Sequence, residues 1–157
     1  MVDTDTLKYI RKMQTSPPVN IVGIAKVLGL AVWEDENLPD KISGKIFKDS
    51  SNGGSLGYSI VIRSQDSYAR KRFTVAHELA HYILHRGLFK DVLIDDALYR
   101  SGLSSRIEAQ ANGLAADLLM PWHLLAPMSD APISELAKTF EVSEEAMRIR
   151  LNRSKGA

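Results

Sequence analysis

The spacing of apolar residues changes along the chain and predicts a succession of helices, strands and longer helices. A short polar helix is predicted at residues 3–14 and ends before Pro17-Pro18. Apolar residues then recur at helical spacing from Asn20, a plausible N-cap, to Leu28. Strands are predicted by alternation or by β-branched and aromatic residues at 30–33, 42–47 and 58–63. The turn signal at residues 49–54 joins the last two, so we expect a small antiparallel sheet with hairpin connections.

From residue 67 onward the pattern is helical. Residues 67–85 contain no Gly or Pro and are apolar around most of the helix, which is typical of a helix buried in a core. A second core helix is predicted from about Arg106 to Leu119. Shorter helices are predicted near 133–140, with an N-cap at Ser134 or the residue before it, and near 144–152, with Ser143 as the N-cap. The predicted fold class is therefore α+β, with the sheet packed beside the helix of residues 67–85.

The composition of the chain limits its possible functions more than it limits its possible folds. The chain has 157 residues, a net charge of +1 and no cysteine. This charge balance gives no general attraction to nucleic acid or to a membrane surface. Disulfides and thiolate ligands are excluded, so a metal site must use histidines and carboxylates. The N-terminus lacks the features of a signal peptide and no apolar stretch is long enough to span a bilayer, so we expect a cytoplasmic protein without membrane contact.

The segment His77-Glu78-Leu79-Ala80-His81 is an H-E-x-x-H motif inside the first core helix. Residues four apart lie about 40° apart around a helix and about 6 Å apart along it, so the two imidazoles can converge on one metal ion. Glu78 lies about 100° further round and could act as the catalytic base on a metal-activated water without being a ligand. The alternative is two ordinary histidines and a surface glutamate, which is less favoured because buried imidazoles need partners.

A catalytic zinc site usually has three protein ligands and one open position. Glu108, on the second core helix, is the best candidate for the third ligand. Local sequence supports an alternative equally well, because Ser105 and Glu108 form a capping box in which the carboxylate bonds its own helix N-terminus. Rival ligands lie in the connector between the two helices, at Asp91, Asp95 and Asp96.

Other residues around this candidate centre allow more than one interpretation. Asn112 follows Glu108 by one helical turn and could bond the outer ring nitrogen of a zinc-bound histidine, or it could make a simple interhelical hydrogen bond. His85 is interpreted as a structural or helix-end histidine. Three tyrosines could supply a second oxyanion donor, and the sequence does not choose among them: Tyr58, Tyr82 and Tyr99.

Two blocks of sequence resemble the ImmA/IrrE family of metallo-endopeptidases. Residues 72–85 look like the zinc helix of that family, and residues 108–121 look like its third-ligand helix. The resemblance implies a zincin-like core, a Zn²⁺ cofactor held by His77, His81 and Glu108, and Glu78 as the base. Ala80 departs from the pattern, since the family often has Gly there.

The resemblance also implies a biological role. Members of this family commonly act on helix-turn-helix repressors of mobile elements or stress regulons. We therefore expect a cytoplasmic zinc endopeptidase that cleaves such a repressor and derepresses its genes. The alternative is a binding module that sequesters or modulates a DNA-binding repressor without cleaving it, in which zinc would be structural. Glu78 argues against that alternative, because a structural site needs no base.

The chain is predicted to divide into a zinc peptidase domain at residues 1–127 and a C-terminal helical pair at 128–157. Residues 132–152 resemble a helix-turn-helix, and three arginines could contact phosphate: Arg148, Arg150 and Arg153. The favoured interpretation is that the pair covers the peptidase core, because neighbouring glutamates dilute the basic patch. Direct DNA binding is the less favoured alternative.

Overall fold

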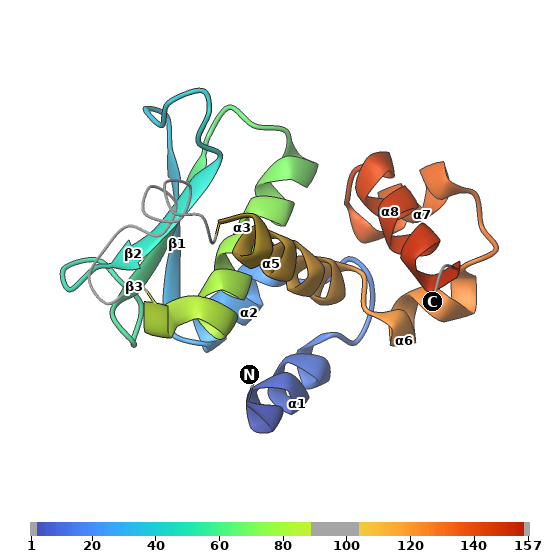
Figure 1. Ribbon diagram of the computed structural model, residues 1–157, viewed down its shortest axis with the longest axis horizontal. Helices are drawn as coiled ribbons and strands as arrows, with labels where there is room; N and C mark the ends of the chain where they lie inside the picture. The colour runs from blue at the N-terminus through green and yellow to red at the C-terminus, as the bar shows by residue number, and fades with distance from the viewer. Residues whose placement is uncertain (1–2, 89–103, 156–157) are drawn as a thin grey trace.

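The computed structural model describes residues 3–88 and 104–155 (Figure 1). Its elements follow in the order α1 (Thr4–Met13), α2 (Ile21–Val27), β1 (Leu30–Asp35), β2 (Gly44–Lys48), β3 (Tyr58–Arg63), α3 (Tyr68–His85), η1 (Arg86–Leu88), α5 (Ser104–Leu119), α6 (Trp122–Leu125), η2 (Ala126–Met128), α7 (Ile133–Phe140) and α8 (Glu144–Lys155). The predicted α+β fold class is confirmed. The rivals Asp91, Asp95 and Asp96, together with Tyr99, lie outside the described residues.

Side-chain caps start two helices where the sequence predicts them, but the predicted serine cap of α7 (Ile133–Phe140) is wrong, because Ser134 lies inside that helix and no side chain caps it. The Asn20 Oδ1 atom accepts a hydrogen bond from the amide of Gly23 at 3.0 Å, which confirms the predicted N-cap of α2. The Ser143 hydroxyl accepts from the amide of Ala146 at 3.0 Å at the start of α8. These local bonds satisfy helix-end amides without help from distant parts of the chain.

The sheet has the strand order β1-β3-β2, with β3 in the centre. Strands β2 and β3 are antiparallel as predicted, with Gly44 opposite Ile62. Strands β1 and β3 are parallel, with Leu30 opposite Tyr58, so the prediction of an antiparallel sheet with hairpins throughout is wrong for this pair. The reason is the connection from β1 to β2: it spans residues 36–43, and β3 then occupies the place between the two strands.

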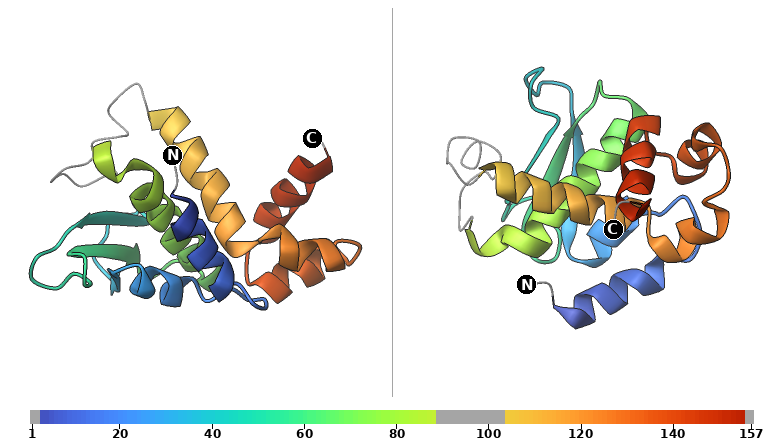
Figure 2. Two further views of the ribbon diagram at one scale, coloured as in Figure 1. Left: turned by 90° about the horizontal axis from the view of Figure 1, so that it is seen from below. Right: turned by 45° about the vertical axis from the view of Figure 1, so that its right-hand side comes forward.

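Helix α3 lies between the sheet and α5 and forms the centre of the molecule (Figure 2). Ile46 and Ile60 from the sheet and Leu79 from α3 are all fully buried in one core. Both core helices also carry fully buried alanines, whose small side chains allow close approach: Ala76 and Ala80 on α3, and Ala111 and Ala115 on α5. The close packing of these two helices brings their polar residues within hydrogen-bonding distance.

The C-terminal helices α7 and α8 pack on each other and lie to one side of the α3/α5 core (Figure 1). Arg150 of α8 is only 6% exposed, and its Nε donates to the carbonyl oxygen of Met120 at 3.1 Å. It also pairs with Asp117 at 2.7 Å and lies over the ring of Trp122, 4.6 Å from the centroid. The prediction that Arg150 could contact phosphate is therefore wrong, because its guanidinium is engaged in holding α8 against the end of α5. Across the described ranges 3–88 and 104–155, no helix combines the length and apolarity needed to cross a membrane.

Candidate metal centre

Helices α3 and α5 bring two histidines and one carboxylate to a single point. The Nε2 atoms of His77 and His81 are 3.1 Å apart. Glu108 places Oε1 at 2.8 Å from His81 Nε2 and Oε2 at 3.0 Å from His77 Nε2. The i, i+4 spacing on α3 makes the imidazoles converge, and α5 crosses close enough for Glu108 to complete the set.

The outer nitrogen of His77 has its own partner. His77 Nδ1 lies 2.8 Å from the side-chain oxygen of Asn112, one turn after Glu108 on α5. An amide oxygen only accepts, so His77 carries its proton on Nδ1 and donates it to Asn112. In the neutral ring this leaves a lone pair on Nε2, directed at Glu108 and His81. The contact is the one considered for Asn112 from the sequence.

His81 is oriented by a chain of two further side chains. Its Nδ1 lies 3.0 Å from Nδ1 of His85, and His85 Nε2 lies 2.9 Å from the side-chain oxygen of Gln110. Because Gln110 Oε1 accepts a hydrogen bond from His85 Nε2–H, the neutral His85 ring accepts a hydrogen bond at Nδ1, and His81 donates that bond from its own Nδ1. His81 Nε2 is then also a lone-pair donor. His85 is only 5% exposed, so the chain is enclosed in the interior.

This arrangement fits a divalent cation better than it fits hydrogen bonding alone. With both outer nitrogens protonated, the two Nε2 lone pairs and the Glu108 carboxylate converge on one point with no proton to share. A cation at that point would bind all three donors at once. Two imidazole nitrogens and one carboxylate oxygen, with no thiolate, are a donor set that suits catalytic zinc.

Burial and charge keep these groups in their metal-binding forms. Burial in the core lowers the pKa of His81, which favours the neutral ring that a metal requires. Burial acts to raise the pKa of Glu108. Without a metal, a proton on Nε2 of His77 or His81 can be donated to the carboxylate, and these hydrogen bonds outweigh burial and lower the pKa of Glu108 to about 2. A bound cation would take the place of those protons. Glu108 is therefore a carboxylate at any physiological pH.

Glu78 lies beside this centre in a cleft of about 910 Å³ that is also lined by His77 and Glu108. Its side chain is 2% exposed. Gly44 of β2 lines the same cleft, and a Cβ atom at Gly44 would lie 3.7 Å from Cγ of Glu78. The edge of the sheet therefore closely approaches the part of α3 that carries Glu78.

The structure does not support the other roles that the sequence suggested for residues near the site. The Glu108 carboxylate contacts the two histidines, and α5 begins at Ser104, so the capping-box alternative with Ser105 is wrong. Tyr82 is buried against the ring of Tyr58, with centroids 5.1 Å apart, and neither tyrosine lines the cleft. Sequence reasoning interpreted His85 only as structural and missed its contact with His81. The contact could have been predicted, because His81 and His85 are four residues apart on one helix and such residues are neighbours on its surface.

The fold and this donor set on two core helices define a zincin-like domain. Residues 25–152 match the family described as the IrrE N-terminal-like domain. The chain therefore belongs to this family, as the resemblance to ImmA/IrrE proteins implied.

Similar proteins of known name extend this comparison. The chain is 39% identical over 92 residues to the radiation response metalloprotease IrrE of Deinococcus radiodurans, a match that covers 54% of this chain and 27% of that protein. A Mycobacterium tuberculosis transcriptional regulator has a similar fold, with a TM-score of 0.62 at 15% identity, covering 91% of this chain and 44% of that one. The chain thus spans less than half the length of either relative.

Proposed function

We propose that the protein is a zinc-dependent endopeptidase in which His77, His81 and Glu108 hold the metal. The observation that carries this proposal is the convergence of three donors, with Glu78 on the same helix as the two histidines and lining the cleft beside them. The family membership and the metalloprotease named among its relatives support the same activity. A purely structural site would have no use for a cleft that opens beside its ligands.

When bound, zinc would polarise a water molecule and the scissile carbonyl. Glu78, which lines the same cleft, would take a proton from the attacking water and return it to the leaving amine. Asn112 and His85 would hold the two imidazoles in the tautomers that leave both Nε2 atoms free to bind metal. Glu108, ionised throughout the physiological range, would supply one negative charge to the site.

The proposed substrate is a helix-turn-helix transcriptional repressor, cleaved in the cytoplasm so that mobile-element or stress genes are switched on. The support is the family resemblance, in which such repressors are common targets, and the radiation response named for the Deinococcus protein. The match to the mycobacterial regulator concerns the fold alone.

The test compares Glu78→Gln with His77→Ala. The amide of Gln is nearly isosteric but cannot act as a base, so zinc content should survive while turnover falls by about 100-fold to 10,000-fold. His77→Ala removes a ligand and should lower zinc content itself. Each protein is co-expressed with a repressor encoded next to its gene, and the fragments are measured by mass spectrometry.

The same experiment addresses the alternative of a binding module. Under the proposed function, Glu78→Gln binds the repressor and leaves it intact, and the target transcripts stay low. If Glu78→Gln induces those transcripts as well as the wild type does, with the repressor whole in both, the protein acts without cleavage.

A further inference from the structure

The cleft beside the candidate metal centre extends well beyond it and reaches the C-terminal helical pair. Four separate parts of the chain supply apolar side chains to its lining: Ile42 before β2, Phe73 on α3, Ala116 with Met120 at the end of α5, and Ala146 with Ile149 on α8. In Figure 2, α5 and α8 diverge from their junction near α6, so that α8 stands apart from α5. The C-terminal helices therefore form part of the boundary of the same cleft that contains His77, Glu78 and Glu108.

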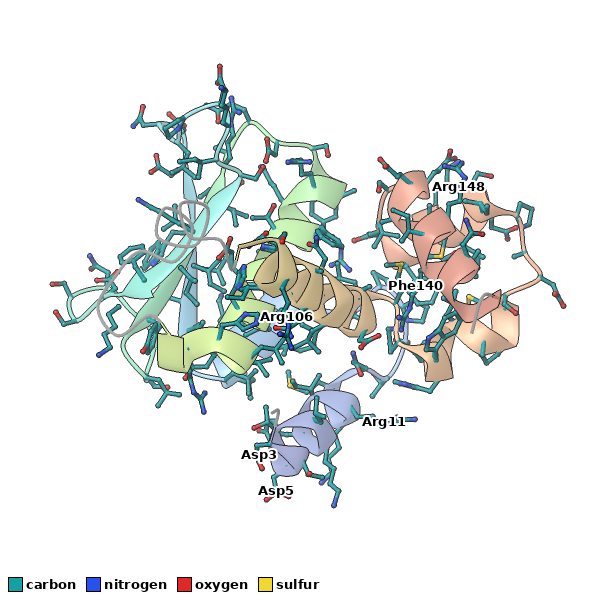
Figure 3. All side chains as sticks on the ribbon, in the orientation of Figure 1. Asp3, Asp5, Arg11, Arg106, Phe140 and Arg148 are labelled. Carbon is teal, nitrogen blue, oxygen red and sulfur yellow. The ribbon has the colours of Figure 1, made fainter. Side chains whose placement is uncertain are left out.

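Helix α8 has two distinct apolar sides. Met147 is fully buried in the core cluster, together with Leu151. Ile149 is 48% exposed, and it is adjacent on the helix surface to Ala146, three residues earlier. Packing against α7 accounts for the first side and leaves the second side, Ala146 and Ile149, facing the cleft. Arg148 lies on another side of α8, at the outer part of the helical pair (Figure 3).

The position of α8 is held from two directions. The buried Arg72 of α3 donates from Nε to the carbonyl oxygen of Glu141 at 3.1 Å and from Nη2 to that of Phe140 at 3.2 Å. These carbonyls end α7, just before α8 begins. Arg150 ties the other half of α8 to the end of α5. The wall that Ala146 and Ile149 form is therefore fixed relative to the helix that carries His77 and Glu78.

We propose that α8 is a substrate-binding wall, and that Ala146 and Ile149, in the cleft that Phe73 also lines, receive an apolar side chain of an extended protein segment. This inference rests on the proposed function, since it assigns the occupant of the cleft as the segment to be cleaved. Continuity of the wall with the candidate centre argues for that occupant, because Ile149 and Glu78 line one and the same cleft. The lining does not favour nucleic acid, because its three basic residues (Lys41, Arg70 and Arg150) are balanced by three acidic ones (Glu78, Glu108 and Glu145) and give no net attraction to phosphate.

We expect the wall to prefer substrates with an apolar side chain at the position that contacts Ile149, because that contact buries apolar surface. Covering the exposed part of Ile149 with an apolar side chain removes both from water, whereas a polar side chain there loses hydration without a partner. Burial of one aliphatic side chain is worth enough to favour apolar over polar residues at that position by about tenfold or more.

The chain has no cysteine, so a single introduced cysteine can carry a unique label. Ile149→Cys and its matched control Arg148→Cys are each made together with Glu78→Gln, labelled with a benzophenone and irradiated with a library of proteome-derived peptides. Mass spectrometry then identifies the attached peptides. The proposal expects attachment at position 149 to exceed that at 148, with apolar residues enriched about tenfold at the attached position.

Equal attachment at the two positions, no attachment at 149, or attachment there without apolar enrichment would overturn the proposal. Cleavage of the same library by the unlabelled wild-type protein tests the proposed function separately. If the wild type cleaves nothing but position 149 still captures apolar peptides, the binding wall stands and the endopeptidase activity fails. If the wild type cleaves peptides and position 149 captures none, the activity stands and the wall is wrong.

Discussion

The Nδ1 atoms of His81 and His85 lie 3.0 Å apart, so the outer nitrogen of one candidate zinc ligand is paired with a second histidine and not with solvent. His85 in turn contacts Gln110 of α5 at 2.9 Å. His77 has a separate partner in Asn112. Each candidate imidazole ligand is thus oriented by a side chain that would not touch the metal, and the two supports are independent of each other.

Removing the His85 acceptor should weaken metal binding. His85→Leu leaves the Nδ1–H of His81 without its acceptor in a buried site, so we expect zinc affinity to fall by about 10-fold to 100-fold. His85→Gln offers an amide oxygen as a replacement acceptor and should retain more of the affinity than His85→Leu. Affinity is measured by competition with a chromophoric chelator, which does not depend on peptidase activity.

The control for this prediction is His123→Leu. His123 of α6 is half-buried, contacts the backbone carbonyl oxygen of Gln14 at 2.7 Å, and does not line the cleft that holds the candidate centre. Its substitution should leave zinc affinity unchanged. Equal zinc affinity in His85→Leu and the wild type would show that His85 does not orient His81.

Arg72 should stabilise the fold more than most charged residues do. Arg72→Leu removes the donors for the carbonyl oxygens of Phe140 and Glu141 and should lower the free energy of unfolding by about 1–3 kcal/mol. Arg70→Leu is the matched control, since the Arg70 side chain is 67% exposed and pairs with Asp66, which predicts a loss below about 1 kcal/mol. Urea denaturation measures both. Equal losses for the two variants would mean that Arg72 does not anchor the helical pair.

The sequence predicted most of the elements because apolar periodicity is a local property. The helix of α3 and the positions of His77 and His81 on it follow from spacing alone. Helix α6 was missed because its four residues are too few to show a period. The parallel pairing of β1 with β3 was missed for a different reason. Which strand pairs with β1 is decided by contacts between distant segments, and the local pattern of apolar residues does not depend on those contacts.

The contacts between the two core helices are the part of the candidate site that local sequence could not predict. Local sequence left Glu108 equally suited to capping its own helix, and only the family resemblance favoured a role as ligand. The structure brings Glu108 to the histidines because α5 packs closely against α3. Gln110 and His85 meet through the same packing, which spacing within either helix could not predict.

Asp49 should link the stability of the β2–β3 hairpin to pH. Its carboxylate accepts from the amide of Asn52 at 2.9 Å and from the hydroxyl of Ser59 at 2.8 Å, and these bonds lower its pKa below the ordinary value of 3.8. A carboxyl whose pKa is lower in the folded state stabilises the fold above its unfolded pKa and loses that contribution as pH falls through the folded pKa. Asp49→Ala should therefore be less stable than the wild type at neutral pH.

The difference in free energy of unfolding between Asp49→Ala and the wild type should be constant above about pH 5 and should shrink as pH falls below 3.8. Urea titrations at a series of pH values measure it. The fluorescence of Trp33 is a suitable local probe, because its indole N–H donates to the Ser59 hydroxyl at 3.2 Å. A difference that stays constant down to the acid limit would mean that Asp49 does not titrate in this way.

Gly44 is required by the close approach of β2 to α3. A Cβ atom there would overlap Cγ2 of Thr74 and lie 3.0 Å from the carbonyl oxygen of Val61. Because Gly44 is buried and one of these neighbours is backbone, Gly44→Ala should lower the free energy of unfolding by about 1–3 kcal/mol. Gly87→Ala is the control, since nothing lies within 4 Å of a Cβ atom at that position.

A double-mutant cycle identifies the overlap with Thr74 as the cause. Thr74→Ser deletes the Cγ2 methyl group, so adding Gly44→Ala to the Thr74→Ser protein should destabilise it less than Gly44→Ala destabilises the wild type. The expected coupling is about 0.5–2 kcal/mol, within the range for residues in contact. Part of the loss should remain, because the Val61 carbonyl is unchanged in both backgrounds. A coupling of zero would place the strain at that carbonyl alone, and a Gly44→Ala protein as stable as Gly87→Ala would mean that the strand has room to move away from the helix.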